Sequence, residues 1–449
     1  MSTELVALKH ATETTAVVFY RGLSNGTLTV SCNGQTFTGD TIDTTLLDGT
    51  GIVTVTGLSA GTDYPFTLSL DGVEKYSGTL KTAPAAGSTF TLGWGSCAKY
   101  NRPWAGGALL QKFPDLAGFA FIGDFPYLDD ALTSNFTMNG ETIKDLGAAM
   151  IPDPASQSVA QANIYAHHRF YWNLEGAKQL MRSVPCWFTP SDHDIGPGDN
   201  WNGTITQANA YHTWATLQSH VDNMTTWCAD AMRKVYWRGN PSNASANNNS
   251  AYAANEQTYY TFDYGSATVL VLDHASHSDW SAVRLGATQT QWVKDTLLAS
   301  TQPFKIVMAG GSITEYDSNL TTQATEWLAI SDYVTAQGIT GVVVCVGDLH
   351  TPAIFNDGVI THVRAGASGQ TPHTNLPDGY TASCRYKYQG YYSNGTTIPD
   401  RMHVAGYVRV HGSEYMECGI LTEYGDDLVP PCQIYAGSNE VQYPQVKFG

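Results

Sequence analysis

Apolar and polar residues alternate in short runs along the first 84 residues. Four such runs stand between turns rich in Gly, Asn and Asp: TAVVFYR, TLTVSC, IVTVTGL and YPFTLSL. A period of two residues is typical of a half-buried β-strand, and KTAPAAGS (81–88) is typical of a connector. The pattern therefore predicts a small all-β domain over residues 1–84, followed by a larger domain over residues 85–449.

The pattern changes after residue 89. Continuous apolar runs now end in small or polar residues: TFTLGWGS, AGFAFIGD, CWFTPSD, TVLVLDH, KIVMAGG and GVVVCVGD. Between them lie longer stretches for which we predict helices, at roughly 157–182, 205–232, 286–299 and 321–336. Buried strands separated by helices indicate an α/β core with layers on both faces of its sheets. Short strands return after residue 351 and are expected to complete the sheets.

Charge and composition narrow the class of partner. Apolar residues make up 42% of the 449 residues, enough for large buried cores. A formal net charge of -17 argues against nucleic acid or an anionic membrane as the main partner, because both require basic patches. No apolar run reaches the roughly 18 residues of a membrane-spanning helix. The N-terminus lacks the features of a secretory signal, so we expect a chain that is cytoplasmic, already trimmed or delivered by another route, such as incorporation into a virus particle.

Eight cysteines are scattered along the chain without CxxC spacing. This distribution excludes a zinc ribbon and differs from a disulfide scaffold. Cys345, inside the apolar run GVVVCVG, is expected to be an ordinary core residue. The sequence leaves two questions undecided: whether a few disulfides form in the C-terminal third of the chain, and which redox compartment the protein occupies.

Residues that can bind a metal or take part in catalysis lie where the predicted strands end. These strand ends are Ser96-Cys97, Gly123-Asp124, Ser191-Asp192-His193-Asp194, Asp273-His274 and Gly347-Asp348-Leu349-His350. Because ligands in open α/β sheets bind at the carboxyl ends of strands, these residues are expected to converge. Carboxylates brought together repel one another unless a cation neutralises them. A set that mixes carboxylate, imidazole and thiolate suits a mixed pair of metals better than zinc alone.

Each of these features also has a purely structural interpretation. Asp124 can cap a following helix, Tyr127 can be a packing tyrosine, and Cys97 can be a small buried apolar residue. His167-His168 lie within a predicted helix at a spacing that cannot bring both to one metal, and we interpret them as structural. The segment SDHDIGPGDN (191–200) is more specific, because a strand that opens into acidic and His positions is costly without a ligand.

The order of these motifs resembles the PhoD-like (alkaline phosphatase D) metallophosphatases. The matching series is GSC, FPDLAGFAFIGDFPYLD, VPCWFTPSDHDIGPGDN, VLVLDH, TQTQWVKDTLLAS followed by KIVMAGG, and VVVCVGDLH, over about residues 89–365. The stretch VTVTGLSAGTDYPFTLSLDG in turn resembles a fibronectin type III domain. The resemblance implies a fibronectin type III-like β-sandwich before a four-layer α/β metallophosphatase core, with two facing mixed sheets flanked by helices.

The resemblance also implies a site with two metals. The ligands of a ferric iron would be Cys97, Asp124, Tyr127 and His350. Asp124 would bridge to a second cation, expected to be calcium although other divalent ions are compatible, and Asp192 and Asp348 would complete that site. His193 would stabilise the transition state or act as the general acid, beside the catalytic Asp124. Nearby cations that would contact substrate are Lys99, Arg102 and Arg169.

The implied activity is hydrolysis of phosphomonoesters and/or phosphodiesters by in-line attack of a metal-bound hydroxide. Its partner would be a small phosphate ester, with no stable nucleic acid or membrane partner, at an extracytoplasmic or virion-associated location or in a cell-surface assembly. The sequence departs from the family's pattern at three places on the substrate side. Ser191 replaces the first of two aspartates, and the arginine expected two residues after Asp273 is absent. Phe125-Pro126 replaces the family's usual, more open pair. Two alternatives therefore stay open. One is a structural or adhesive protein, for example of a virion, that retains the metal cage without strong activity; the other is a hydrolase of another class, such as one acting on nucleotides.

Overall fold

The computed structural model describes fifteen stretches of the 449-residue chain. They are residues 4–98, 104–128, 136–138, 141–143, 157–195, 217–241, 258–275, 284–311, 323–348, 350, 352–356, 359–366, 386–387, 403–428 and 431–442. The chain forms two compact units. The first comprises Met1–Ala83, Phe125–Phe188 and Asp192–Thr258, and the second comprises Pro84–Asp124, Thr189–Ser191 and Tyr259–Gly449. Within the described stretches, every helix is too short or too polar to cross a lipid bilayer.

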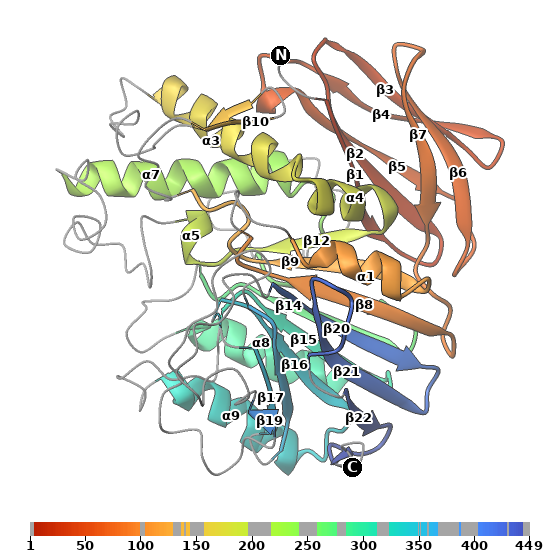
Figure 1. The fold of residues 1–449 in the computed structure, drawn as a ribbon, viewed down its shortest axis with the longest axis vertical. Helices are drawn as coiled ribbons and strands as arrows, with labels where there is room; N and C mark the ends of the chain where they lie inside the picture. The colour runs from red at the N-terminus through yellow and green to blue at the C-terminus, as the bar shows by residue number, and fades with distance from the viewer. Residues whose placement is uncertain are drawn as a thin grey trace. The chain divides into compact units, whose positions relative to one another are not determined.

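The first unit begins with two antiparallel sheets that share one core. One sheet has the order β1-β2-β5, with β1 (Leu5–Ala11), β2 (Thr15–Arg21) and β5 (Thr50–Thr56). The other has the order β4-β3-β6-β7, with β4 (Gln35–Ile42), β3 (Gly26–Cys32), β6 (Asp63–Leu70) and β7 (Val73–Lys81). Alternate residues such as Val18, Val53, Leu28 and Leu68 belong to the common core, as the alternation in the sequence predicts. Figure 1 shows the strands of the two sheets.

Helices make up most of the rest of the first unit. The elements are α3 (Gln157–Trp172), α4 (Glu175–Ser183), α5 (Asp192–Ile195), α7 (Gln218–Ala231), the π-helical turn η3 (Met232–Tyr236) and a small hairpin of β10 (Phe136–Met138) and β11 (Glu141–Ile143). The predicted helix 157–182 is thus two helices, α3 and α4. The prediction for 205–232 overlaps α7, and its first part lies outside the described residues.

A buried lysine ties the strands of the first unit to its helices. The Lys9 side chain on β1 is 1% exposed, and its Nζ donates a hydrogen bond to the Tyr236 carbonyl at 2.7 Å. The same Nζ atom lies over the rings of Trp172 and Phe188, at 4.6 Å and 3.9 Å from their centroids. A buried amine held by aromatic faces and a carbonyl is a contact that forms only when strands and helices fold together.

Two seven-stranded sheets contain the strands of the second unit. The first sheet has the order β12-β9-β8-β20-β21-β22-β23, with β12 (Cys186–Thr189), β9 (Leu116–Ile122), β8 (Thr89–Gly95), β20 (Val404–His411), β21 (Tyr415–Thr422), β22 (Cys432–Tyr435) and β23 (Val441–Gln442). Strands β8 and β9 are parallel, whereas β20 to β23 run as an antiparallel meander. The short strands after residue 351 thus complete the sheets, as predicted.

The second sheet has the order β13-β14-β15-β16-β18-β17-β19. Its strands are β13 (Tyr260–Tyr264), β14 (Ala267–Leu272), β15 (Phe304–Ala309), β16 (Val342–Val346), β18 (Thr361–Arg364), β17 (Ala353–Asn356) and β19 (Tyr386–Lys387). The central strands β14, β15, β16 and β18 are parallel. Parallel strands bring their carboxyl ends to one edge of the sheet, which is where the ligand-bearing motifs follow them.

Helices cover these sheets on their outer faces. The helices α8 (Gly286–Ala299) and α9 (Gln323–Ala336) pack on the second sheet, and α1 (Gly106–Lys112) contacts β8, β20 and β21 (Figure 1). Both α8 and α9 lie where the sequence predicts them. The two sheets meet through their inner side chains, since Tyr264 of β13 contacts the Phe90 ring and donates its hydroxyl hydrogen bond to the Ala117 carbonyl at 2.7 Å.

Candidate metal centre

The strand ends of the second unit approach one another so closely that several positions require glycine. A Cβ atom added to Gly123, after β9, would lie less than 3.0 Å from Ser191. One added to Gly347, after β16, would come equally close to Ser96, and one added to Gly310, after β15, would meet the Pro190 carbonyl oxygen. Ends of strands from both sheets therefore converge, as the motifs predict, and these glycines make the approach sterically possible.

Three proposed ligands share an unusual backbone conformation. Cys97, Asp124 and Asp348 each stand two residues after their strand ends, and their φ angles are 57°, 53° and 61°. This left-handed region costs a non-glycine residue about 1–2 kcal/mol. Such strain persists where the surrounding structure imposes it, and it concentrates at functional sites. The repeated geometry turns each of these residues out of its strand at the same point.

Contacts between these strand ends fix the three segments together. The Cys97 Sγ lies 3.2 Å from the Asp124 Oδ2 and 3.3 Å from the Asp348 carbonyl oxygen. The Asp348 N–H donates to the Ser96 Oγ at 3.0 Å. Cys97 and Asp124 are fully buried, at 0% and 1% exposure. A thiol, a carboxylate and the Asp348 turn therefore form one compact group.

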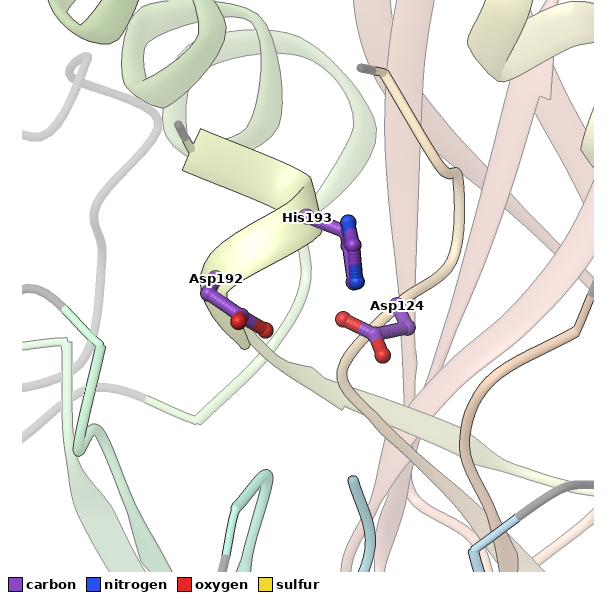
Figure 2. Close-up of side chains that lie close together, drawn as sticks. All are labelled: Asp124, Asp192 and His193. Carbon is purple, nitrogen blue, oxygen red and sulfur yellow. The ribbon is translucent and has the colours of Figure 1, made fainter. Parts of the chain in front are cut away.

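The ligand atoms of Asp124, Asp192 and His193 lie within 4.8 Å of one another. Asp192 and His193 begin the short helix α5, and Asp124 lies on the loop after β9; Figure 2 shows the three side chains pointing toward one another. Both aspartates are buried, and His193 is half-buried. Among the described residues, these three form the group of potential ligands whose spacing suits a metal ion.

The loop after Asp124 runs along helix α5. The Phe125 N–H donates to the Asp194 carboxylate at 2.9 Å, and the Leu128 N–H donates to the His193 carbonyl oxygen at 3.1 Å. The buried Tyr127 ring lies against the His193 imidazole, with 4.4 Å between ring centroids. These contacts orient the His193 side chain. Asp194 is a site residue to which the sequence assigns no role, although its place in SDHD could have marked it.

A second histidine near the strand ends is kept neutral by the fold. His274, two residues after β14, is fully buried, and its Nδ1 accepts a hydrogen bond from the Gly311 N–H at 3.1 Å. Burial, with a smaller effect of the Arg284 charge, lowers the pKa of His274 from 6.5 to about 3. Burial also lowers the pKa of His10, to about 4, and that of His168.

His274→Gln is expected to make the protein less sensitive to acid. Because the folded state holds the imidazole neutral, the unfolded chain binds the extra proton between about pH 6.5 and pH 3, and stability is lost as the pH falls through that window. One such proton changes the unfolding free energy by about 1.4 kcal/mol per pH unit. Urea unfolding of wild type and variant should therefore give a shallower pH slope for the variant, with the partly exposed His411→Gln as control. Parallel curves would contradict the assignment.

The other residues predicted for the site differ in where they lie. Asp348 and His350 are half-buried at the end of β16, while Lys99 and Arg102 lie outside the described residues. The Arg169 guanidinium pairs with Asp48 at 2.7 Å, within the first unit, and this ion pair gives its charge a structural role. His168 is fully buried and stacks on Tyr236 with 4.3 Å between centroids, as expected of a structural histidine.

The donor set fits metal ions. The buried carboxylates of Asp124 and Asp192, whose oxygens lie within 4.8 Å of each other, repel in a dry site, and a cation between them neutralises both with the His193 imidazole beside it. The adjacent Cys97 thiol adds a soft ligand to this set of hard ones. The residues therefore match what a metal centre requires.

The fold of this chain is similar to the folds of two solved structures. Among solved structures, the chain is similar to PhoD, with a TM-score of 0.67, 14% identity, and coverage of 97% of this chain and 87% of that one. It is also similar to the purple acid phosphatase PPD1 from seeds of yellow lupin (Lupinus luteus), with a TM-score of 0.62, 14% identity, and coverage of 95% and 73%. No protein-family model and no curated protein matches the sequence. The PhoD-like resemblance predicted from the motifs is thus confirmed at the level of the fold.

Proposed function

We propose that this protein is a metal-dependent phosphoesterase that hydrolyses phosphomonoesters, phosphodiesters or both. The observation that carries the proposal is the Asp124, Asp192 and His193 group at the strand ends, in a chain with the fold of PhoD and of a purple acid phosphatase. Phosphoryl transfer needs little covalent chemistry from the protein and depends on positioning and charge stabilisation. A rigid cluster of ligands at converging strands supplies both.

The same proposal extends to the metals. A ferric iron would be held by Cys97, Asp124, Tyr127 and His350, and a calcium or another divalent ion by Asp124, Asp192 and Asp348. Support comes from the 3.2 Å distance between Cys97 Sγ and Asp124 Oδ2 and from the preference of soft and hard cations for thiolate and carboxylate ligands. When bound, such a metal pair activates water and neutralises charge on the phosphoryl oxygens.

The protein's own groups have separate tasks in this reaction. The Asp124 carboxylate would bind both cations, since it lies close to the thiol of Cys97 as well as to Asp192 and His193. The His193 ring, held by its contact with Tyr127, would donate a proton to the leaving alkoxide or a hydrogen bond to a phosphoryl oxygen. Asp194 acts as a positioning residue because its carboxylate holds the backbone of Phe125.

Finer features of the fold belong to the same proposal. The strand orders β1-β2-β5 and β4-β3-β6-β7 support a fibronectin type III-like sandwich, and the helices outside two touching sheets support a four-layer core. The domain division after residue 84, the phosphate-ester partner and the extracytoplasmic or virion-associated location stay predictions.

Metal content and turnover test the function together. We expect elemental analysis of the purified protein to find iron and a second cation, and the protein to hydrolyse a chromogenic phosphodiester or phosphomonoester. Cys97→Ser should weaken visible absorption and lower the metal content, whereas Cys228→Ser, at a buried position on α7, should change neither. Zinc alone, or no stoichiometric metal, would overturn the metal assignment. Bound metals without turnover of any phosphoester would favour the structural role.

A further inference from the structure

Three thiols lie buried in the core of the second unit, away from the strand ends. Cys418 belongs to β21, Cys432 to β22 and Cys345 to β16 on the other sheet, and each is 0% exposed. All three are reduced in this structure. Cys345 lies near Cys418 and Cys432 across the core.

Two of the three thiols stand directly opposite each other. Cys418 and Cys432 are register partners in the antiparallel pair β21–β22, and each thiol is fully buried beside the other. Directly paired residues of antiparallel strands have Cα atoms about 4.5–5.5 Å apart, and a disulfide needs about 4.4–6.8 Å. The backbone of this pair therefore already has the spacing of a disulfide. Cys345 faces the pair from another sheet and has no such register relation to either thiol.

We propose that Cys418 and Cys432 are a redox-sensitive pair that closes into a cross-strand disulfide when the protein meets an oxidising thiol buffer. The thiolate of one cysteine attacks oxidised glutathione, breaks its S–S bond and releases one glutathione thiolate. The second cysteine then attacks the mixed disulfide and releases the other glutathione. In the balanced reaction, the protein dithiol loses two electrons and two protons, and one oxidised glutathione becomes two reduced glutathione molecules.

The position of the pair in the sheet explains how an enclosed thiol can react. Burial raises the pKa of the Cys418 thiol well above 9, so attack must begin from a locally opened state. Cys432 lies on β22, which has four residues and pairs on its other side with β23, which has two. Short strands near the edge of a sheet open at lower free energy than central strands. Oxidation would then lock β22 onto β21, and the redox state of the compartment would set which form accumulates.

The test uses the full-length protein purified under reducing conditions. It is equilibrated with mixtures of reduced and oxidised glutathione, quenched by alkylation and digested without reduction for mass spectrometry. We expect a linked pair of peptides carrying Cys418 and Cys432 with a mass loss of two hydrogens. We also expect the oxidised form to unfold about 5 °C higher than the reduced form. Reduction should reverse both changes.

Two variants separate this pair from its neighbours. Cys418→Ala should abolish both the linked peptide and the shift in unfolding temperature, and Cys32→Ala, at a buried cysteine on β3 of the first unit, should leave both unchanged. A wild type that stays fully alkylated in oxidised glutathione would overturn the proposal even if the variants fail to fold. A Cys345–Cys418 or Cys345–Cys432 linkage would overturn it too, because the register pairing would then not select the disulfide.

Discussion

Asp124→Asn is expected to abolish the proposed hydrolysis of phosphodiesters and phosphomonoesters. The substitution keeps the shape of the side chain but removes the negative charge that would balance two cations, at a residue whose ligand atoms lie within 4.8 Å of those of Asp192 and His193. Asn also tolerates the left-handed backbone that Asp124 adopts, with φ 53°, so the fold should survive. Metal content by elemental analysis and turnover of a chromogenic phosphoester are the measurements.

The control for this change lies at the opposite end of the same strand. Asp115 precedes β9, whereas Asp124 follows it, and Asp115 forms a partly exposed pair with Arg409 at 3.1 Å. Asp115→Asn should keep wild-type turnover, because exposed pairs contribute only about 0–1 kcal/mol. His193→Ala should retain metal and lose rate by about 10²–10⁴-fold, the range for a positioned acid or base. Wild-type turnover in both Asp124→Asn and His193→Ala would place the chemistry elsewhere.

Asp48→Asn is expected to lower the free energy of unfolding by about 3–5 kcal/mol. The Asp48 carboxylate, 9% exposed, accepts hydrogen bonds from Arg21 at 3.2 Å, from Arg169 at 2.7 Å and from the Tyr236 hydroxyl at 2.5 Å. Without its charge, two nearly buried guanidinium groups lose their shared counter-ion. Breaking a buried ionic network from one side leaves uncompensated charge, which is why the effect is large.

Denaturant unfolding followed by circular dichroism checks this prediction. Asp63→Asn, an exposed aspartate at the start of β6, serves as the matched control and should change stability by less than about 0.5 kcal/mol. Asp48 lies in η1 (Leu47–Gly49), between sandwich strands, whereas Arg169 belongs to α3 and Tyr236 to η3. The sandwich strands and these helices are therefore expected to unfold in one transition. A second, separate transition for residues 1–83 would contradict the coupling.

Local patterns in the sequence determined the elements. The two-residue alternation predicts the strands of the sandwich, and the continuous apolar runs predict β8, β9, β14, β15 and β16. The helix predicted at 286–299 coincides with α8. The break between α3 and α4 was missed, because a turn of two residues, Asn173 and Leu174, disturbs a helical pattern too little to be recognised. The motifs at the strand ends also placed Asp124, Asp192 and His193 in one candidate site.

Only the tertiary structure decided which strand ends meet and how their residues are oriented. Gly123 contacts Ser191, and Gly347 contacts Ser96, across chain separations that no periodicity records. Local patterns also do not predict the left-handed backbone of Cys97, Asp124 and Asp348. The same is true of the hydrogen bond between Asp194 and Phe125 and of the pairing of Cys418 with Cys432. Periodicity reports which face of an element is buried, because that depends on neighbours two residues away in a strand and three or four residues away in a helix. The partner across that face is selected by packing over the whole chain, so it becomes visible only once the chain has folded.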